Sequence, residues 1–171
     1  MKVVTVLDVE NTTIKRNNKL MLDPFEAENS LTMVGMLNHS GEKIITFDHS
    51  EQQPTTEGGS IVQNILDDTH LLVMQNAIHD LTWLWESGFN YTGDIFDTML
   101  GAYIIQRGQK EPLSLEYLAE RYKCDTQKMG TLKDYFNKGY TTRDIPHAEL
   151  SQYLSADLHA TMELYLSLIH I

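Results

Sequence analysis

The stretch Val3-Val4-Thr5-Val6-Leu7-Asp8-Val9-Glu10 is the part of the sequence that most constrains the fold. Residues 3–7 are β-formers throughout, which is typical of a strand buried in a sheet. Asp8 falls at or near the end of that strand, and Glu10 points to the same side because strand side chains alternate. Taken alone, an Asp-x-Glu pair is explained just as well by a strand that ends in ordinary exposed acids.

A further acid follows a second short apolar run. Residues 71–74 predict a strand, and Gln75-Asn76 open a helix whose apolar positions (Ile78, Leu81, Leu84 and Trp85) lead to a stop at Gly88. Asn76 and Asp80 are four residues apart, so they share one face near the start of the helix. An equally good interpretation makes Asn76 the helix N-cap and Asp80 a first-turn acid favoured by the helix dipole.

The last acid lies in a long amphipathic pattern that predicts a helix from Pro146 to about Tyr165. Asp157 falls on the apolar face of this helix, where a carboxylate is costly unless it is paired or bound to a metal. Tyr153 lies one turn earlier on the same face, so both side chains can point at one site. A tyrosine in such a place is usually a core residue, and the nearby Asp157 is what favours a functional role.

The residue types at these three places suit phosphodiester hydrolysis. That reaction needs a deprotonated nucleophile and positive charge beside the leaving oxygen, and two metal ions about 3.5–4 Å apart supply both. Mg²⁺ and Mn²⁺ prefer oxygen ligands. We therefore predict that two such ions are held by four carboxylates: Asp8, Glu10, Asp80 and Asp157. Tyr153 is predicted to hold the attacking water.

These segments, in this order, resemble the 3′→5′ proofreading exonuclease domain of family A DNA polymerases, the tyrosine branch of the DEDD exonucleases. The resemblance covers roughly Lys2 to Leu164 and includes segments 95–105 and 115–122, which look like two helices of that domain. It implies an α/β, ribonuclease H-like fold: a mixed central β-sheet, its first three strands antiparallel and the later ones parallel, flanked by α-helices. The histidine branch is excluded because Gln152 occupies the position of its general base.

The resemblance also implies roles for individual residues. Glu10 would assist Tyr153 in orienting the attacking water, in addition to binding metal. Contacts with nucleic acid are expected from Asn11, Thr12, Ile14 and Asn76. Asn11 and Thr12 match positions that contact the terminal nucleotide, and Ile14 matches an apolar residue that wedges against the last base.

The expected function is metal-dependent 3′→5′ hydrolysis of phosphodiester bonds at the 3′ end of DNA, as the proofreading domain of a DNA polymerase. The expected partners are a single-stranded or frayed 3′ end and a polymerase domain downstream in the same chain. An exoribonuclease of RNA processing stays open, because no residue is identified that would read a 2′-hydroxyl. A catalytically inactive scaffold that contacts nucleic acid or a polymerase is the other alternative.

Composition sets outer limits on these expectations. A chain of 171 residues, of which 42% are hydrophobic, is predicted to form one globular domain. Its one cysteine, Cys124, excludes an internal disulfide and fits a reducing cytoplasm. We expect a cytoplasmic protein with no membrane partner, because the sequence has neither a spanning apolar run nor a signal peptide.

The net charge of −11 disfavours tight binding to a nucleic-acid backbone, which normally needs a basic face. A few nucleotides at a frayed end can still be held by metal ions and base stacking. We therefore expect weak affinity of the isolated domain for DNA, with a neighbouring domain supplying the main grip.

The rest of the chain completes the expected order of elements. A hairpin is predicted from strands 31–37 and 43–48, then a helix over 60–68 and a strand over 94–96, while residues 11–29 and 129–140 are expected to be irregular. Asp97-Thr98 is expected to cap the next helix rather than bind metal. His79-Asp80 lacks the further spaced histidines of an HD phosphohydrolase, and Trp83 and Trp85 are predicted to be core or partly buried residues.

The predicted domain comprises residues 1–165. Residues 166–171 coincide with what a common sequencing-library transposon end encodes in one frame, so we expect a non-native tail at a truncated C-terminus. A genuine last turn of the long helix is the alternative, since Leu166 and Ile169 continue its apolar pattern.

Overall fold

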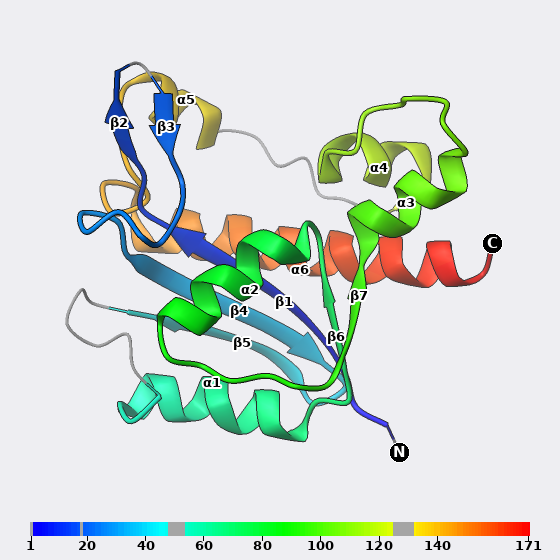
Figure 1. Cartoon of the computed structure of the whole chain (residues 1–171), viewed down its shortest axis with the longest axis horizontal. Helices are drawn as coiled ribbons and strands as arrows, with labels where there is room; N and C mark the ends of the chain where they lie inside the picture. Colours follow the sequence, from blue (N-terminus) through cyan, green and yellow to red (C-terminus); the bar gives the residue numbers. More distant parts are fainter. Residues whose placement is uncertain (1, 18, 48–53, 125–131) are drawn as a thin grey trace.

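The computed structural model describes residues 2–17, 19–47, 54–124 and 132–171. Its centre is a five-stranded sheet in the order β5-β4-β1-β6-β7 (Figure 1). The strands are β1 (Val4–Asn11), β4 (Leu31–Asn38), β5 (Gly41–Thr46), β6 (Leu71–Met74) and β7 (Asp94–Asp97). Strand β4 runs antiparallel to both β1 and β5, whereas β6 runs parallel to both β1 and β7. The mixed sheet predicted from the sequence is confirmed.

A second, two-stranded sheet follows β1 directly. It is the hairpin of β2 (Ile14–Arg16) and β3 (Lys19–Met21), which pair antiparallel. The prediction of irregular structure over residues 11–29 was wrong for these two strands. Each has three residues, and Lys15, Arg16 and Lys19 are exposed, so no alternation of buried and exposed residues marks them in the sequence.

Six helices are described: α1 (Glu57–Asp68), α2 (Ala77–Glu86), α3 (Thr98–Gln106), α4 (Leu115–Arg121), α5 (Leu132–Asn137) and α6 (His147–Ile169). Helix α1 begins three residues before the predicted start, because the Thr56 side chain caps it by accepting the Gly59 N–H. Helix α5 lies where irregular structure was expected, so that prediction was wrong over 132–137, and residues 129–131 lie outside the described part. None of the described helices is both long and apolar enough to cross a lipid bilayer.

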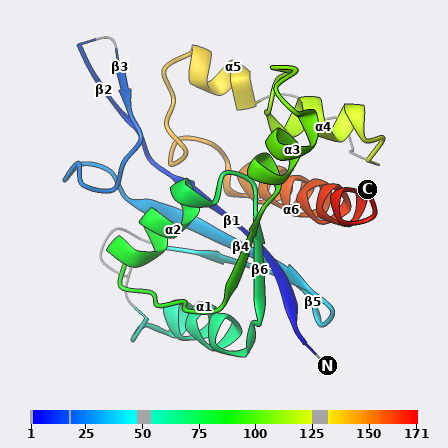
Figure 2. The same cartoon turned by 45° about the vertical axis from the view of Figure 1, so that its right-hand side comes forward.

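The helices cover both faces of the large sheet. Figure 2 shows α1 and α2 on one side and α6 on the other. Alternation along β1 divides its side chains between these faces: Leu7 and Val9 pack in the core under α1 and α2, while Val6 packs against Leu158 of α6. Asp8 and Glu10 have the same parity as Val6, so they extend on the α6 side.

Helix α6 lies unusually close to the sheet at Gly35, which pairs with Asp8 in the β1–β4 register. A Cβ atom on Gly35 would lie 2.8 Å from Leu158 Cδ1 and 2.9 Å from Leu154 Cγ. The absence of a side chain therefore lets α6 approach the strand. Because Asp157 precedes Leu158, this approach brings its carboxylate to β1.

The outer face of α2 differs from the predicted apolar stripe. Trp83 is 2% exposed, and its Nε1 donates a hydrogen bond of 3.1 Å to the Leu22 carbonyl, which makes it part of the core. Ile78 is 78% exposed and Trp85 54% exposed, so their assignment to the buried face was wrong for Ile78 and only partly right for Trp85. Gly88, with a φ of 89°, follows the end of the helix as predicted.

Helix α6 continues through residues 166–169. Leu168 is buried beside Leu164 and Ala102. This packing is what a genuine last helical turn would make, and the boundary at residue 165 stays a prediction.

Candidate metal centre

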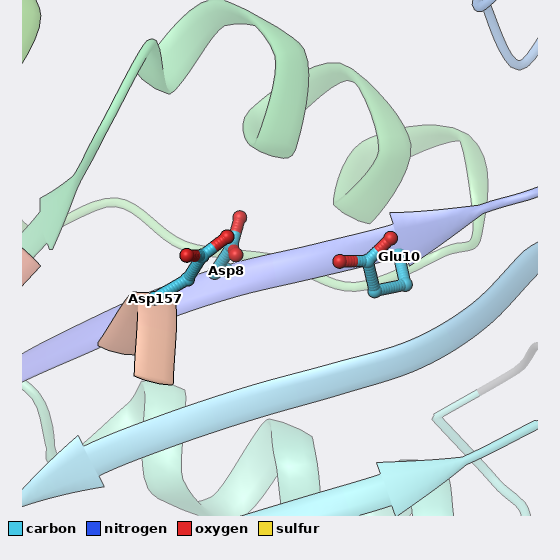
Figure 3. A group of neighbouring side chains, drawn as sticks. All are labelled: Asp8, Glu10 and Asp157. Carbon is cyan, nitrogen blue, oxygen red and sulfur yellow. The ribbon is translucent and has the colours of Figure 1, made fainter. Parts of the chain in front are cut away.

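Three carboxylates from two elements meet at the centre of the molecule. Asp8 and Glu10 extend from β1 and Asp157 from α6, and one oxygen of each lies within 4.8 Å of the others (Figure 3). Alternation along β1 places the first two on one face, and the close approach of α6 at Gly35 adds the third. The structure therefore brings three of the four predicted ligands together, and their role as metal ligands stays a prediction.

Asp80 lies next to this group rather than within it. It is 1% exposed and lies near the start of α2, close to the backbone of Val9. Strand β1 pairs with β6 only as far as Val6, so its later residues leave that edge open to a side chain. Burial first, and then the charges of Asp8 and Glu10, raise the pKa of Asp80 well above its usual range.

The four acids destabilise one another as anions. Burial raises the pKa of Asp8 to about 7. Burial, followed by the charge of Asp8, raises the pKa of Asp157 to about 8. The pKa of Glu10 is also well above normal, through burial and then through Asp8 and Asp157. Such a cluster favours either bound protons or bound cations.

The oxygen atoms of the cluster fit a hard divalent cation. Asp157 Oδ1 and Asp80 Oδ2 are buried and have no hydrogen-bond partner among the described residues. A buried carboxylate oxygen without a partner is costly unless a cation completes its surroundings. All four side chains offer oxygen alone, the donor that Mg²⁺ and Mn²⁺ prefer.

Tyr153 lies one helical turn before Asp157 and half-buried beside it. Its ring packs against the hydrophobic cluster that includes Met33, Leu150 and Leu154, and its hydroxyl lies close to the Asp157 carboxyl group. Burial, followed by the nearby negative charges, raises the pKa of Tyr153 and keeps the hydroxyl protonated. A neutral hydroxyl at this position can orient a water molecule but is a poor metal ligand.

Asn11 is buried and held on both sides. Its Nδ2 donates to the Thr12 carbonyl at 2.7 Å, and its Oδ1 lies 3.0 Å from His79 Nε2. Burial lowers the pKa of His79, which favours the neutral ring. The hydrogen on Nε2 then donates to Asn11 Oδ1, at the end of β1.

Thr12 and Ile14 occupy different surroundings. The Thr12 side chain is buried, and its Oγ1 accepts the Ser30 N–H at 2.7 Å. The predicted contact of Thr12 with a nucleotide would have to use an atom that already has this partner. Ile14 begins β2 and is half-buried. The nucleic-acid contacts assigned to Asn11, Thr12 and Ile14 stay predictions.

Asn76 occupies the N-cap position of α2, but its side chain makes no capping bond. The alternative interpretation, with Asn76 as the N-cap and Asp80 as a first-turn acid, is therefore right about both positions, although the Asn76 side chain does not make the capping bond. The contact of Asn76 with nucleic acid stays a prediction. Asp97 satisfies the helix start instead, accepting the N–H groups of Asn76 and Ala77. Asp97 also caps α3, as predicted, by accepting from Met99 and Leu100.

Comparison with protein families gives one match over most of the chain. The model of the 3′-5′ exonuclease family, built on the exonuclease domains of family A DNA polymerases, matches residues 21–170. A DNA polymerase I from Borreliella burgdorferi is 30% identical over 102 residues, which cover 60% of this chain. The matched region spans 11% of that polymerase.

Solved structures share the fold at low sequence identity. RNase D of Trypanosoma brucei superposes with a TM-score of 0.69 at 14% identity, covering 97% of this chain and 57% of that one. NrnC of Brucella melitensis gives a TM-score of 0.67 at 15% identity, covering 98% and 72%. A family B DNA polymerase of Pyrobaculum calidifontis gives 0.64 at 15% identity, covering 99% and 25%.

Proposed function

The chain belongs to the 3′-5′ exonuclease family, and from that premise we propose that it removes nucleotides one at a time from the 3′ end of DNA. The observation that carries this proposal is the convergence of Asp8, Glu10 and Asp157 within 4.8 Å, with the Tyr153 hydroxyl beside Asp157. This arrangement supplies metal ligands and a group that orients water at one place.

We assign the four carboxylates to two divalent ions, Mg²⁺ or Mn²⁺. Asp8, Glu10 and Asp157 would hold one ion, because their oxygens lie mutually closest. Asp80 would hold the second together with Asp8, which is the nearby charge that most perturbs Asp80. When bound, the two ions would supply an activated water and positive charge beside the leaving oxygen.

The remaining residues prepare the site for substrate. Tyr153 is kept protonated, so it would orient the attacking water through its hydroxyl, with Glu10 assisting. Packing of its ring against Met33 and Leu154 limits the positions that the hydroxyl can occupy. Catalysis in this scheme depends on positioning and charge.

We further propose that the chain works as the proofreading part of a DNA polymerase. The support is its likeness to DNA polymerase I of Borreliella burgdorferi, of which it matches only 11%. The net charge of −11 agrees with this arrangement, because a domain so acidic benefits from a neighbour that holds the DNA backbone.

The deciding experiment follows the shortening of a 5′-labelled single strand by the purified chain. With Mg²⁺ or Mn²⁺ we expect a ladder of products that shorten stepwise from the 3′ end, and none in the presence of chelator. Asp157→Ala serves as the inactive control. A matched RNA strand tests the alternative of an exoribonuclease, which would degrade it faster than DNA. Internal cleavage of a strand blocked at its 3′ end would contradict the proposal.

A further inference from the structure

A cavity of about 360 Å³ lies between the ends of β4 and β5 and the start of α6. The residues of its wall that matter here are Thr32, Met33, Thr46, Thr142, Arg143 and His147. Its volume falls at the lower end of the range of small-ligand pockets. None of the roles assigned above uses it.

The cavity adjoins the metal centre. Met33 is paired with Glu10 across β1 and β4, and opposed side chains in such a pair have Cβ atoms about 4.5–5.5 Å apart. The Thr32 hydroxyl donates to the Glu10 carbonyl at 2.8 Å. Leu150, which also lines the cavity, lies one turn of α6 before Tyr153. A ligand in the cavity would therefore be separated from the carboxylates by the Met33 side chain.

The lining of the cavity is basic and hydroxyl-rich. It contains Arg143, His147 and three threonines, and no carboxylate, in a chain with a net charge of −11. Both ring nitrogens of His147 have partners, Thr46 at 2.5 Å and Ser151 at 3.3 Å. His147 therefore holds the Thr46 hydroxyl in place, and the donor left for an anion is chiefly Arg143.

Arg143 is held by one hydrogen bond, and the charge of the neighbouring Asp144 acts on it without a salt bridge. Its Nη2 donates to the Ser30 hydroxyl at 2.9 Å, and it forms no salt bridge with a carboxylate of the described residues. A guanidinium has five N–H donors in a planar fork that suits phosphate oxygens. Most of these donors stay free to bind an anion at the cavity.

We propose that this cavity binds a backbone phosphate of the substrate strand, on the 5′ side of the bond that is cut. The proposal rests on the function proposed above and extends it to the path of the strand. Arg143 makes the charged contact, and the hydroxyls of Thr142 and Thr46 are placed to complete it. The site would hold the strand in register while the terminal nucleotide lies at Asp8, Glu10 and Asp157.

The first experiment compares two substrates that share the scissile phosphate. A single-stranded oligonucleotide carries further phosphates on its 5′ side, whereas the p-nitrophenyl ester of thymidine 5′-monophosphate carries none. For Arg143→Gln we expect the KM of the oligonucleotide to rise about 5- to 30-fold relative to that of the ester, in line with one charge-assisted hydrogen bond. Arg143→Lys should recover part of this loss because it retains the charge.

The second experiment locates the phosphate. Oligonucleotides with one neutral methylphosphonate, at the first, second or third linkage 5′ of the scissile bond, are compared in the wild type and in Arg143→Gln. At one of the three linkages we expect the methylphosphonate to weaken binding to the wild type. In Arg143→Gln the same methylphosphonate should cause no further loss of binding. Arg107→Gln, at the end of α3, removes the same charge outside the cavity and should behave as wild type.

Each of the two experiments can give a result that overturns the assignment. One is an equal rise of KM for both substrates in Arg143→Gln, which would indicate a structural role through Ser30. The other is the absence of coupling between Arg143 and any of the three linkages. A wild-type chain that hydrolyses neither substrate with Mn²⁺ would instead contradict the proposed function itself. A third test measures inhibition by inorganic phosphate. If Arg143→Gln relieves this inhibition to the same extent for both substrates, the cavity binds free phosphate, which also overturns the assignment.

Discussion

The carboxylate of Asp97 accepts the backbone N–H of Asn76 at 3.1 Å and so fixes the first turn of a helix to which Asp97 does not belong. The same oxygen accepts the Met99 N–H at 2.9 Å and starts its own helix, α3. Asn76 holds a left-handed backbone conformation, with a φ of 67°, four residues before Asp80. Asp97 therefore helps to fix the position of Asp80, a proposed metal ligand, through the first turn of α2.

Asp97→Ala should lower both stability and metal affinity. It leaves backbone N–H groups of two helix starts without an acceptor, and one such cap is worth about 1 kcal/mol, up to 2 kcal/mol in favourable cases. Urea unfolding gives the free energy of unfolding, and Mn²⁺ titration reports on Asp80. Asp97→Asn, which keeps one oxygen acceptor, should lose less. An alanine variant as stable as the wild type would show that water replaces the carboxylate.

Asp8→Ala and Asp157→Ala should each reduce hydrolysis at least about 100-fold, because each removes a charged ligand from a site that needs both ions. The fold should persist, since the loss of one acid relieves repulsion among those that remain. Single-turnover rates and circular dichroism of the same samples separate the two effects. Near wild-type turnover in either variant would remove that residue from the metal centre.

Tyr153→Phe keeps the ring and its packing but loses the hydroxyl. We expect the single-turnover rate to fall about 10- to 100-fold, less than in Asp157→Ala, because the metal still activates water. Mn²⁺ affinity and the thermal midpoint should change little, since Tyr153 is not assigned as a ligand. An unchanged rate would make Tyr153 a core residue only, and loss of metal would make it a ligand.

The metal-free protein should become less stable as pH rises from about 4 to about 8. The pKa values of Asp8, about 7, and Asp157, about 8, lie above the ordinary carboxyl value near 4, so the folded state binds more protons than the unfolded state across this range. The stability that these two carboxyl groups contribute is complete below about pH 4 and lost above about pH 8. Saturating Mg²⁺ should remove the effect, because the ions compensate the ionised carboxylates.

Thermal midpoints at pH 5 and pH 8, each in chelator and in Mg²⁺, test this dependence. Asp157→Asn provides the control, since it removes one of the four carboxyl groups whose pKa is raised and should make the dependence on pH shallower. A metal-free wild-type protein that melts higher at pH 8 than at pH 5, by a margin that Asp157→Asn does not alter, would contradict the prediction.

Gly35→Ala should destabilise the fold by about 1–3 kcal/mol, the usual cost of overpacking a filled core. The added Cβ would lie 2.8 Å and 2.9 Å from the side chains of Leu158 and Leu154, which must move with α6. Because Asp157 lies on that helix, metal affinity should fall as well. Gly41→Ala is not a suitable control, since Gly41 has a φ of 115°. A Cβ on Gly58, in α1, would lie 2.9 Å from Ile45 Cγ2, so Gly58→Ala introduces a comparable clash that does not involve α6. Gly58→Ala with a similar loss of metal affinity would show that the effect is general.

The sequence predicts the sheet and the long helices because their apolar residues recur at regular intervals. Strand β6 is a short continuous apolar run, β1 begins with residues that favour strands, and α6 repeats apolar residues over more than five turns. The hairpin β2–β3 and helix α5 are too short to show a period. Ile78 and Trp85 fit the helical period but lie on the outer side of α2, because the position of the sheet decides which face is covered.

The meeting of Asp8, Glu10 and Asp157 is also predictable, since each stands at a recognisable place in a strand or helix, whereas the role of these acids and of Asp80 as metal ligands stays a prediction. The capping of the start of α2 by Asp97 is not predictable from the sequence. It depends on the parallel pairing of β6 with β7, in which Met74 lies opposite Asp97, and local sequence does not reveal that register. The cavity beside Glu10 escapes prediction for the same reason, because its lining comes from β4, β5 and the segment before α6.

The metal centre joins the first strand of the chain to its last helix, with Asp8 near one end of the sequence and Asp157 near the other. During synthesis the first strand leaves the ribosome long before the helix that completes the site exists. A nascent or prematurely terminated chain therefore carries Asp8, Glu10 and Asp80 without Asp157 and Tyr153. On the function proposed above, such incomplete copies should not degrade nucleic acid, because the site is complete only when folding brings α6, with Asp157 and Tyr153, against β1.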